Sequence, residues 1–253
     1  MDAFFYFVAV PAVLLTGLSK GGFGGGIAML GTPLLALAIS PIQAAAIMLP
    51  VLILMDIIGL ASYRGLFDRK ILADFLPAAV IGIFAGWLTA AMVSDDWIRI
   101  LVGLIAVVFA LNQFARDFRR LPAASRNRIA AAFWGSLTGF TSFIAHAGGP
   151  PFQAYVVPLK IDKMIFAGTG VVAFAVINAV KVIPYFALGQ FTVQNLQISA
   201  TLMPMAVAGV LSGVWLTRRV PQTIFYNITY AAMIAVGFKL LWDGRAALTA
   251  GFG

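Results

Sequence analysis

Apolar runs long enough to cross a membrane recur along the whole chain and decide its fold class. A helix needs about 20 mainly apolar residues to span the roughly 30 Å of bilayer hydrocarbon. Of the 253 residues, 62% are hydrophobic and only 10% are charged, whereas a soluble domain carries about 25% charged residues. The sequence therefore predicts an all-α polytopic membrane protein with no separate soluble domain.

Ten apolar segments are expected. They cover residues 3–18, 26–39, 42–62, 71–93, 97–115, 128–145, 149–159, 164–187, 195–217 and 222–242. The segments 3–18, 26–39 and 149–159 are short for a full crossing. Each short pair is expected either to form a re-entrant hairpin or to consist of two short helices joined by an unwound link.

The basic residues predict how the chain is oriented. Strict alternation with the N-terminus outside places 12 of the 17 Lys and Arg residues in inner loops. These are Arg64, Arg69, Lys70, Arg116, Arg119, Arg120, Arg126, Arg128, Lys160, Lys163, Arg218 and Arg219. Because positive residues favour the cytoplasmic side, the +8 net charge indicates membrane orientation and not a nucleic-acid partner. The N-terminus is expected to be periplasmic.

Matching residues at a fixed spacing predict two inverted repeats, residues 1–120 and 121–253, within one membrane domain. At a spacing of 122, Thr16-Gly17 matches Thr138-Gly139, Asp56 matches Asn178, and Tyr63 matches Tyr185; at 127, Pro77, Gly82 and Gly86 match Pro204, Gly209 and Gly213. Each half comprises a short-helix pair or re-entrant hairpin followed by three long helices. The first half begins outside and the second inside, as in many secondary transporters.

Two glycine-rich joints lie at equivalent places in the halves. They are "SKGGFGGG" in the first and "TSFIAHAGGPP" in the second. Irregular backbone at membrane depth is tolerated only where protein or a water-filled cavity surrounds it. Short, Gly/Pro-interrupted segments in matching positions point to a transporter's binding site, although a hinge or close helix packing is the alternative. Gly82 with Gly86 and Gly209 with Gly213 have small-xxx-small spacing and are assigned to packing.

The joints suit an anion. Glycines leave backbone N–H groups unshielded, and short helices beginning near Gly26 and Gly149 would direct their positive ends at one place. Polar residues inside the apolar segments add charge and hydrogen bonds, since ionisable groups at this depth are functional candidates. The predicted substrate-binding residues are Ser19, Lys20, Gly21, Gly22, Gly24, Gly25, His146, Gly148, Gly149, Asn178, Lys181 and Tyr185.

Asp56 is the candidate for proton coupling, and a structural ion pair with Lys20 or Lys181 is the alternative. Asn178, Lys181 and Tyr185 follow the i, i+3, i+7 spacing of one helix face, which is expected to point inward. His146 is the only histidine and is either a structural hydrogen-bonding group or a proton relay.

A serine hydrolase is the alternative from another class. Gly17-Leu18-Ser19-Lys20-Gly21 fits the written pattern of a nucleophile turn, and His146 is the only available base. That turn requires a strand before it, and no strand is expected. With no cysteine, no glutamate and one histidine, neither a metal nor another cofactor is expected.

The joints and their flanks resemble a known family. "GLSKGGFGGG", "GTPLLALAISPIQAAAIMLPVLILMDI", "HAGGPPFQAYVVPLKIDK" and "NAVKVIPYFALG" are similar to the TauE/SafE (TSUP) family of sulfite and organosulfonate exporters. The resemblance covers nearly the whole chain in order. It implies a multi-pass protein of the bacterial inner membrane that carries a small sulfur-containing anion, with protons as a candidate coupling ion. A transporter of another anion, such as a carboxylate, is the alternative.

The orientation can be tested by labelling. Cysteines introduced at Arg120 and at Gln190 are expected to react from opposite faces of the membrane, because the first lies in a basic loop and the second in an uncharged one. The chain has no native cysteine, so an impermeant maleimide applied to each side reports each position alone. Labelling of both positions from the same face would contradict the predicted topology.

Overall fold

The fold is a bundle of helices that lie within or over the predicted segments, with one segment much shorter as a helix than expected. The structure is a computed structural model that describes residues 3–23, 28, 31–90, 92, 95–119 and 122–250. The helices are α1 (Ala3–Lys20), α2 (Gly31–Leu35), α3 (Pro41–Ser62), α4 (Arg69–Thr89), α5 (Asp95–Phe118), α6 (Arg128–Ala145), α7 (Gly149–Val156), the 3₁₀ turn η2 (Val157–Leu159), α8 (Lys163–Ala187), α9 (Val193–Arg219) and α10 (Gln222–Ala250). Among the described residues, seven helices are long and apolar enough to cross a membrane, namely α1, α3, α4, α5, α8, α9 and α10. The protein is therefore a multi-pass membrane protein.

Polar side chains mark where the long helices begin. Asp68 accepts hydrogen bonds from the first amides of α4, Asn127 from those of α6, and Asp162 from those of α8. Ser40 and Thr192 cap α3 and α9 in the same way. These residue types satisfy the unpaired N–H groups of a helix start. Helices α5, α9 and α10 extend a few residues beyond their predicted apolar segments, whereas α4 ends at Thr89, before the predicted end at 93.

One predicted segment is much shorter as a helix than expected. Residues 26–39 were expected to be apolar helix, but α2 covers only Gly31–Leu35. The chain then turns, and Ser40 precedes Pro41 at the start of α3. After Leu35 the backbone hydrogen bonds take the three-residue spacing of turns, from the Leu37 amide to Leu34 and from the Ala38 amide to Leu35. Ser40, which precedes proline, is extended, as that position favours. The predicted helix start near Gly26 falls outside the described residues.

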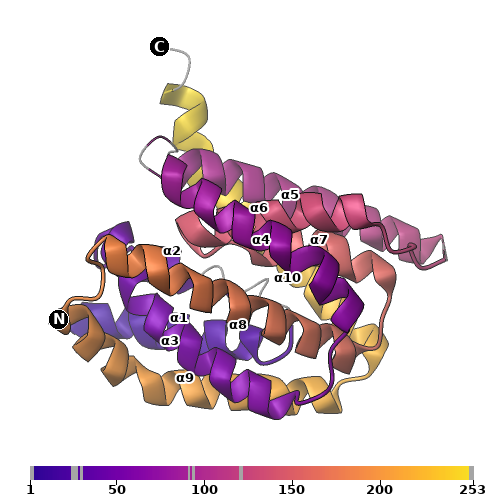
Figure 1. Ribbon diagram of the computed structural model, residues 1–253, viewed down its shortest axis with the longest axis horizontal. Coiled ribbons are helices and arrows are strands. Elements are labelled where there is room, and N and C mark those ends of the chain that lie inside the picture. The colour runs from indigo at the N-terminus through magenta and orange to yellow at the C-terminus, as the bar shows by residue number, and fades with distance from the viewer. Residues whose placement is uncertain are drawn as a thin grey trace.

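The helices form two groups joined by α8. In Figure 1, α4, α5 and α6 lie on one side of the molecule and α1, α3 and α9 on the other. The most extensive contacts are α4 with α6, α5 with α10, and α1 with α9, while α8 packs against both α3 and α4. The space between the groups is thus bordered by α3 and α8.

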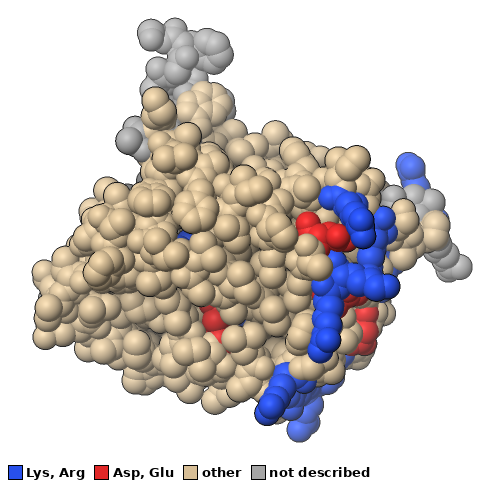
Figure 2. Space-filling model, in the orientation of Figure 1, with Lys and Arg blue, Asp and Glu red and all other residues tan. Residues whose placement is uncertain are grey.

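Basic residues gather at one end of the molecule, which we call the cationic end (Figure 2). Three contacts join helix termini there: Lys163 Nζ donates to the Thr217 carbonyl at 2.8 Å, Arg218 Nη2 to the Ser62 carbonyl at 2.9 Å, and the Ala124 amide to the Pro158 carbonyl at 2.9 Å. The basic loops expected to share one side therefore do lie together. Arg120 falls outside the described residues.

The two short-helix pairs start from opposite ends. The loop before α6 is bonded to η2 at the cationic end, so α6 and α7 form a hairpin that leaves this end and returns to it. At the other end, Gln43 in the first turn of α3 donates to Asn195 in the first turn of α9 at 3.2 Å. Helices α1 and α2 therefore form a hairpin that starts from the end opposite the cationic one.

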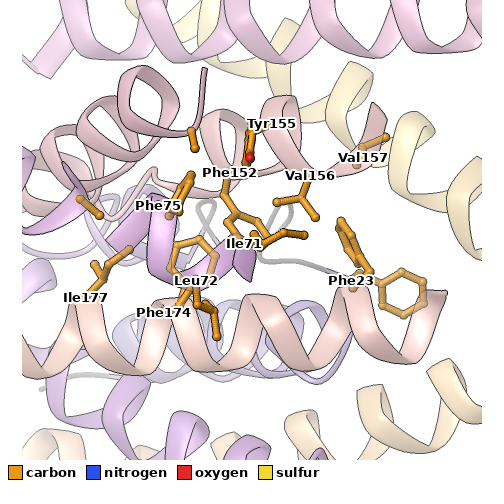
Figure 3. Close-up of a cluster of buried hydrophobic side chains, with 14 of the residues drawn as sticks. Phe23, Ile71, Leu72, Phe75, Phe152, Tyr155, Val156, Val157, Phe174 and Ile177 are labelled. Carbon is orange, nitrogen blue, oxygen red and sulfur yellow. The ribbon is translucent and has the colours of Figure 1, made fainter. Parts of the chain in front are cut away.

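An aromatic cluster packs the short helix α7 against its neighbours. Phe152 lies edge-on to Phe75 of α4, with ring centroids 5.6 Å apart, and 5.4 Å from Phe174 of α8 (Figure 3). Tyr155 stacks on Phe75, and Phe23 lies in the same cluster. Since α7 has only eight residues, about 12 Å of helix, this packing holds it at depth.

Glycines allow the closest helix contacts, as their spacing predicted. A Cβ on Gly82 would overlap the Ser136 carbonyl group of α6 and lie 3.0 Å from the Phe140 nitrogen. A Cβ on Gly209 would lie 2.7 Å from the Leu14 carbonyl oxygen of α1 and 3.1 Å from Gly17 Cα. Helix α4 thus meets α6, and α9 meets α1, through small residues whose backbones nearly touch.

Replacing Gly82 by Leu is expected to destabilise the protein, because the new side chain must separate α4 from α6. Overpacking of this kind typically costs about 1–3 kcal/mol. Ala85 lies one turn away on the exposed face of α4, so Ala85→Leu is the matched control and should leave the thermal unfolding midpoint in detergent unchanged. Equal midpoints for the two variants would show that the α4–α6 contact is not tight.

Candidate functional site

A pocket lies between the two hairpins and the helices α3 and α8. The cavity volume, measured as the space open to the centre of a water molecule, is about 30 Å³. Its described lining residues are Lys20, Ala28, Thr32, Met48, Leu52, Ser142, His146, Gly149, Phe174, Asn178 and Lys181. The pocket therefore collects the end of α1, the α6–α7 joint and the middle of α8, which are far apart in the sequence.

On one side of the pocket, Asp56 contacts both Lys20 and Asn178. Lys20 Nζ lies 2.5 Å from Asp56 Oδ1, and Asn178 Nδ2 donates to Asp56 Oδ2 at 2.6 Å. Asp56 and Asn178 are each 3% exposed, so both carboxylate oxygens are paired away from water. This arrangement joins α1, α3 and α8 and leaves the Lys20–Asp56 pair electrically neutral.

On the other side, Lys181 is completely buried, and its hydrogen-bond partners among the described residues are all neutral. Its Nζ lies 3.0 Å from the Ser142 carbonyl oxygen, 3.2 Å from Ser142 Oγ and 2.7 Å from His146 Nδ1. A buried ammonium group without an opposite charge is costly. The position is therefore suited to a negatively charged ligand.

The contacts of His146 define which ring nitrogen carries hydrogen. Its Nε2 lies 3.2 Å from the Ala45 carbonyl oxygen, which can only accept, so Nε2 carries the hydrogen. Nδ1 then accepts a hydrogen bond from Lys181. The imidazole bridges α3 to α8 and positions the Lys181 ammonium group.

The backbone at His146 explains how its side chain reaches the pocket. His146 ends α6 in the left-handed conformation, with φ of 51°, which few non-glycine residues adopt. Its amide donates to Ser142, and the Ala147 amide donates to the Thr141 carbonyl at 3.2 Å. This cap turns the chain toward α7 and fixes the start of the second joint.

The N-terminus of α7 faces the same pocket through Gly149. Pro150 and Pro151 follow at the first helical positions and have no N–H group. The amides of Gly148 and Gly149 are therefore the donors available at this helix start, where the helix dipole favours negative charge. Gly148 itself packs tightly, because a Cβ there would lie 2.9 Å from both Ser142 Cβ and the Thr138 carbonyl oxygen.

The structure brings together some of the predicted site residues and separates others from them. Lys20, His146, Gly149, Asn178 and Lys181 line the pocket, and Asp56 lies directly behind Lys20. Tyr185 lies beside it, with its hydroxyl 3.5 Å from His146 Nε2. Gly24 and Gly25 fall outside the described residues.

Three predicted residues of the first joint have their closest neighbours elsewhere. A Cβ on Gly21 would lie 2.8 Å from Gly213 Cα of α9, and one on Gly22 would lie 2.8 Å from the Tyr63 hydroxyl. Ser19 is fully buried and is absent from the pocket lining. At Gly21 and Gly22 small size serves close packing, which was the alternative considered for the glycines.

Several lining residues were not predicted. Ser142 bonds Lys181, and its position 122 residues after Lys20 was a signal within the predicted repeat. Met48, Leu52 and Phe174 supply apolar walls and look like ordinary core residues in the sequence. Within the described part of the chain, no three His, Cys, Asp or Glu side chains group closely enough to hold a metal ion.

The helical fold defines a multi-pass membrane protein with a polar pocket in its interior. The chain belongs to the TauE/SafE family, since the family model "Sulfite exporter TauE/SafE" matches residues 9–240. Members of this family are transporters and not enzymes, so the hydrolase alternative with Ser19 and His146 is rejected. Neither a curated protein nor a solved structure matches the chain.

The Lys20–Asp56 pair can be tested by a double-mutant cycle. Lys20→Met alone leaves Asp56 buried without its cation and is expected to cost about 3–5 kcal/mol of stability. The double variant Lys20→Met/Asp56→Asn removes both charges and keeps an amide at position 56, so it should recover most of that loss. Unfolding midpoints in detergent give the comparison, and a double variant as unstable as the single one would argue against the ion pair.

Proposed function

We propose that this protein is a secondary transporter, and specifically an exporter, of a small sulfur-containing anion such as sulfite or an organosulfonate. The anion binds in the pocket between the α6–α7 joint and α8. The observation that carries this proposal is Lys181, which faces the pocket, is completely buried and has only neutral hydrogen-bond partners among the described residues. An anion would supply the missing charge and accept hydrogen bonds from Lys181, Ser142 and the Gly149 amide, with Lys20 and Asn178 available as donors when Asp56 is protonated.

The helix packing supports an inverted repeat, in which α1 to α5 correspond to α6 to α10. Equivalent helices then make equivalent contacts: α1 packs on α9 as α6 packs on α4, and α3 packs on α9 as α8 packs on α4. The hairpins α1–α2 and α6–α7 start from opposite ends of the molecule. Transporters built in this way alternate access around a central site.

Individual side chains support the same repeat at a spacing of 122. Tyr63 donates to the Gly21 carbonyl oxygen at 2.5 Å, and Tyr185 donates to that of Phe143 at 3.4 Å. Gly21 and Phe143 are themselves 122 positions apart. Asp56 and Asn178, which also match, contact each other, as residues near a pseudo-two-fold axis must.

The cationic end is assigned to the cytoplasm by the positive-inside rule. With this orientation the N-terminus would be periplasmic, and the bacterial inner membrane is the proposed location of the protein. In export, the anion would enter the protein from the cytoplasm at the cationic end. The positive residues there raise the local concentration of anions.

Asp56 is proposed to couple transport to protons. Among the described residues, Asp56 is the acidic residue that pairs with a cation of the pocket lining, Lys20. A proton on Asp56 would release Lys20 from its ion pair and make it available to the anion. Protonation would thus change the charge of the pocket without any large movement.

A carboxylate is the second candidate substrate. The hydrogen-bond donors around the pocket are on three sides, from Lys181, Lys20 and the Gly149 amide, which suits the three oxygens of a sulfonate or sulfite group better than the two of a carboxylate. Competition between acetate and methanesulfonate distinguishes the two classes.

Flux in proteoliposomes tests the function. The wild-type protein is expected to exchange sulfite or methanesulfonate, and Lys181→Met should weaken anion binding by about 10- to 100-fold, as for a lost charged hydrogen bond. Lys70→Met removes an exposed lysine at the start of α4 and is the matched control with unchanged flux. Equal affinity in Lys181→Met and the wild type, with both well folded, would place the site elsewhere.

A further inference from the structure

The ionisable groups of the pocket add up to a definite charge. Lys20 and Asp56 neutralise each other at 2.5 Å. His146 accepts a hydrogen bond from Lys181 at Nδ1 and is neutral in this arrangement. Tyr185 is neutral as well. Three acceptors surround Lys181 Nζ, namely the Ser142 carbonyl oxygen, Ser142 Oγ and His146 Nδ1, and they match the three N–H donors of an ammonium group. Lys181 therefore leaves a single positive charge.

The other elements packed around the pocket add no charged side chain to this net charge. Helix α2 (GTPLL) has no ionisable side chain, and α9, which packs on α3, has none before Arg218 at its end. Residues 24–30, part of which lies outside the described residues, are GGGIAML and carry no charge either. The groups that face Asp56 are thus Lys20 from α1 and Asn178 and Lys181 from α8, with His146 after α6.

We infer that the pocket selects singly charged anions and that Asp56 is the residue that sets this selectivity. This inference rests on the proposed transport function and narrows its substrate class. One negative charge beside Lys181 makes the filled pocket neutral. A dianion would leave a buried net negative charge, which is strongly unfavourable at this depth.

A dianion can be accommodated only together with a proton. If Asp56 takes up the proton, Lys20 is freed and the pocket offers two positive charges to two negative ones. The filled pocket is neutral in two cases. Either one monoanion binds without a proton, or one dianion binds together with one proton. By linkage, lowering the pH must strengthen dianion binding and leave monoanion binding nearly unchanged.

The test compares methanesulfonate and sulfate, which are similar tetrahedral ions of one and two charges. Binding to the purified full-length protein is measured by calorimetry from alkaline to mildly acidic pH. We expect methanesulfonate to bind with little pH dependence and sulfate to bind about tenfold or more weakly at alkaline pH, approaching methanesulfonate as the pH falls. Equal binding of both ions at every pH would overturn the inference while leaving the transport function intact.

Binding of neither ion would instead overturn the proposed sulfur-anion function itself. Sulfite provides an internal check, because it changes from a dianion to hydrogensulfite near neutral pH and should follow sulfate in direction. These measurements use the wild-type protein, so they decide the question even where a variant fails to fold.

Variants then assign the effect to Asp56. Asp56→Asn leaves Lys20 and Lys181 as two positive charges, so sulfate should bind at least as tightly as methanesulfonate at all pH values. Lys20→Met/Asp56→Asn restores the single charge, and the preference for methanesulfonate should return. Asp74→Asn removes a carboxylate that pairs with Arg128 at the cationic end and should keep the wild-type ratio. Persistent pH dependence of sulfate binding in Asp56→Asn would overturn the assignment to Asp56.

Discussion

The contact between Lys20, Asp56 and Asn178 is the interaction on which the centre of the molecule depends. In the hydrocarbon interior, an unpaired carboxylate is costly and polar groups must find partners within the protein. Asp56 meets this requirement by taking a cation from α1 and an amide from α8. Three helices that are remote in the sequence are thereby fixed around one point, and the pocket opens beside it.

Close backbone packing is the second requirement for such a pocket. The long helices have little hydrophobic reason to associate inside a bilayer, because lipid tails are as apolar as their side chains. Gly82 and Gly139 allow α4 and α6 to touch, and Gly17 and Gly209 do the same for α1 and α9. These two contacts anchor the long arm of each hairpin, so that its joint can remain irregular without separating from the bundle.

Much of the fold could be predicted from the sequence because its strongest signals are local. Apolar length and polar capping residues locate the helices, and the Asp56–Asn178 match indicates two residues that do touch. The partners within the site depend on long-range packing and could not be read in the same way. The sequence left open whether Lys20 or Lys181 pairs with Asp56, and the structure pairs Asp56 with Lys20. Ser142 and Phe174 acquire their roles only when α6 and α8 meet at the pocket. The shortness of α2 depends on the turn before Pro41, which a hydropathy pattern does not reveal.

Within the proposed repeat, the two halves differ at the positions that carry charge. Lys20 corresponds to Ser142, Asp56 to Asn178, and Gly59 to Lys181, each 122 residues apart. The first half thus contributes Lys20 and Asp56, whose charges cancel. The second half contributes Lys181, which is hydrogen-bonded to Ser142. A symmetric scaffold therefore encloses an asymmetric charge distribution, and the unbalanced positive charge lies on the second half. An anion drawn to Lys181 would contact α8 and the α6–α7 joint first, while the neutral pair on the first half remains free to exchange a proton.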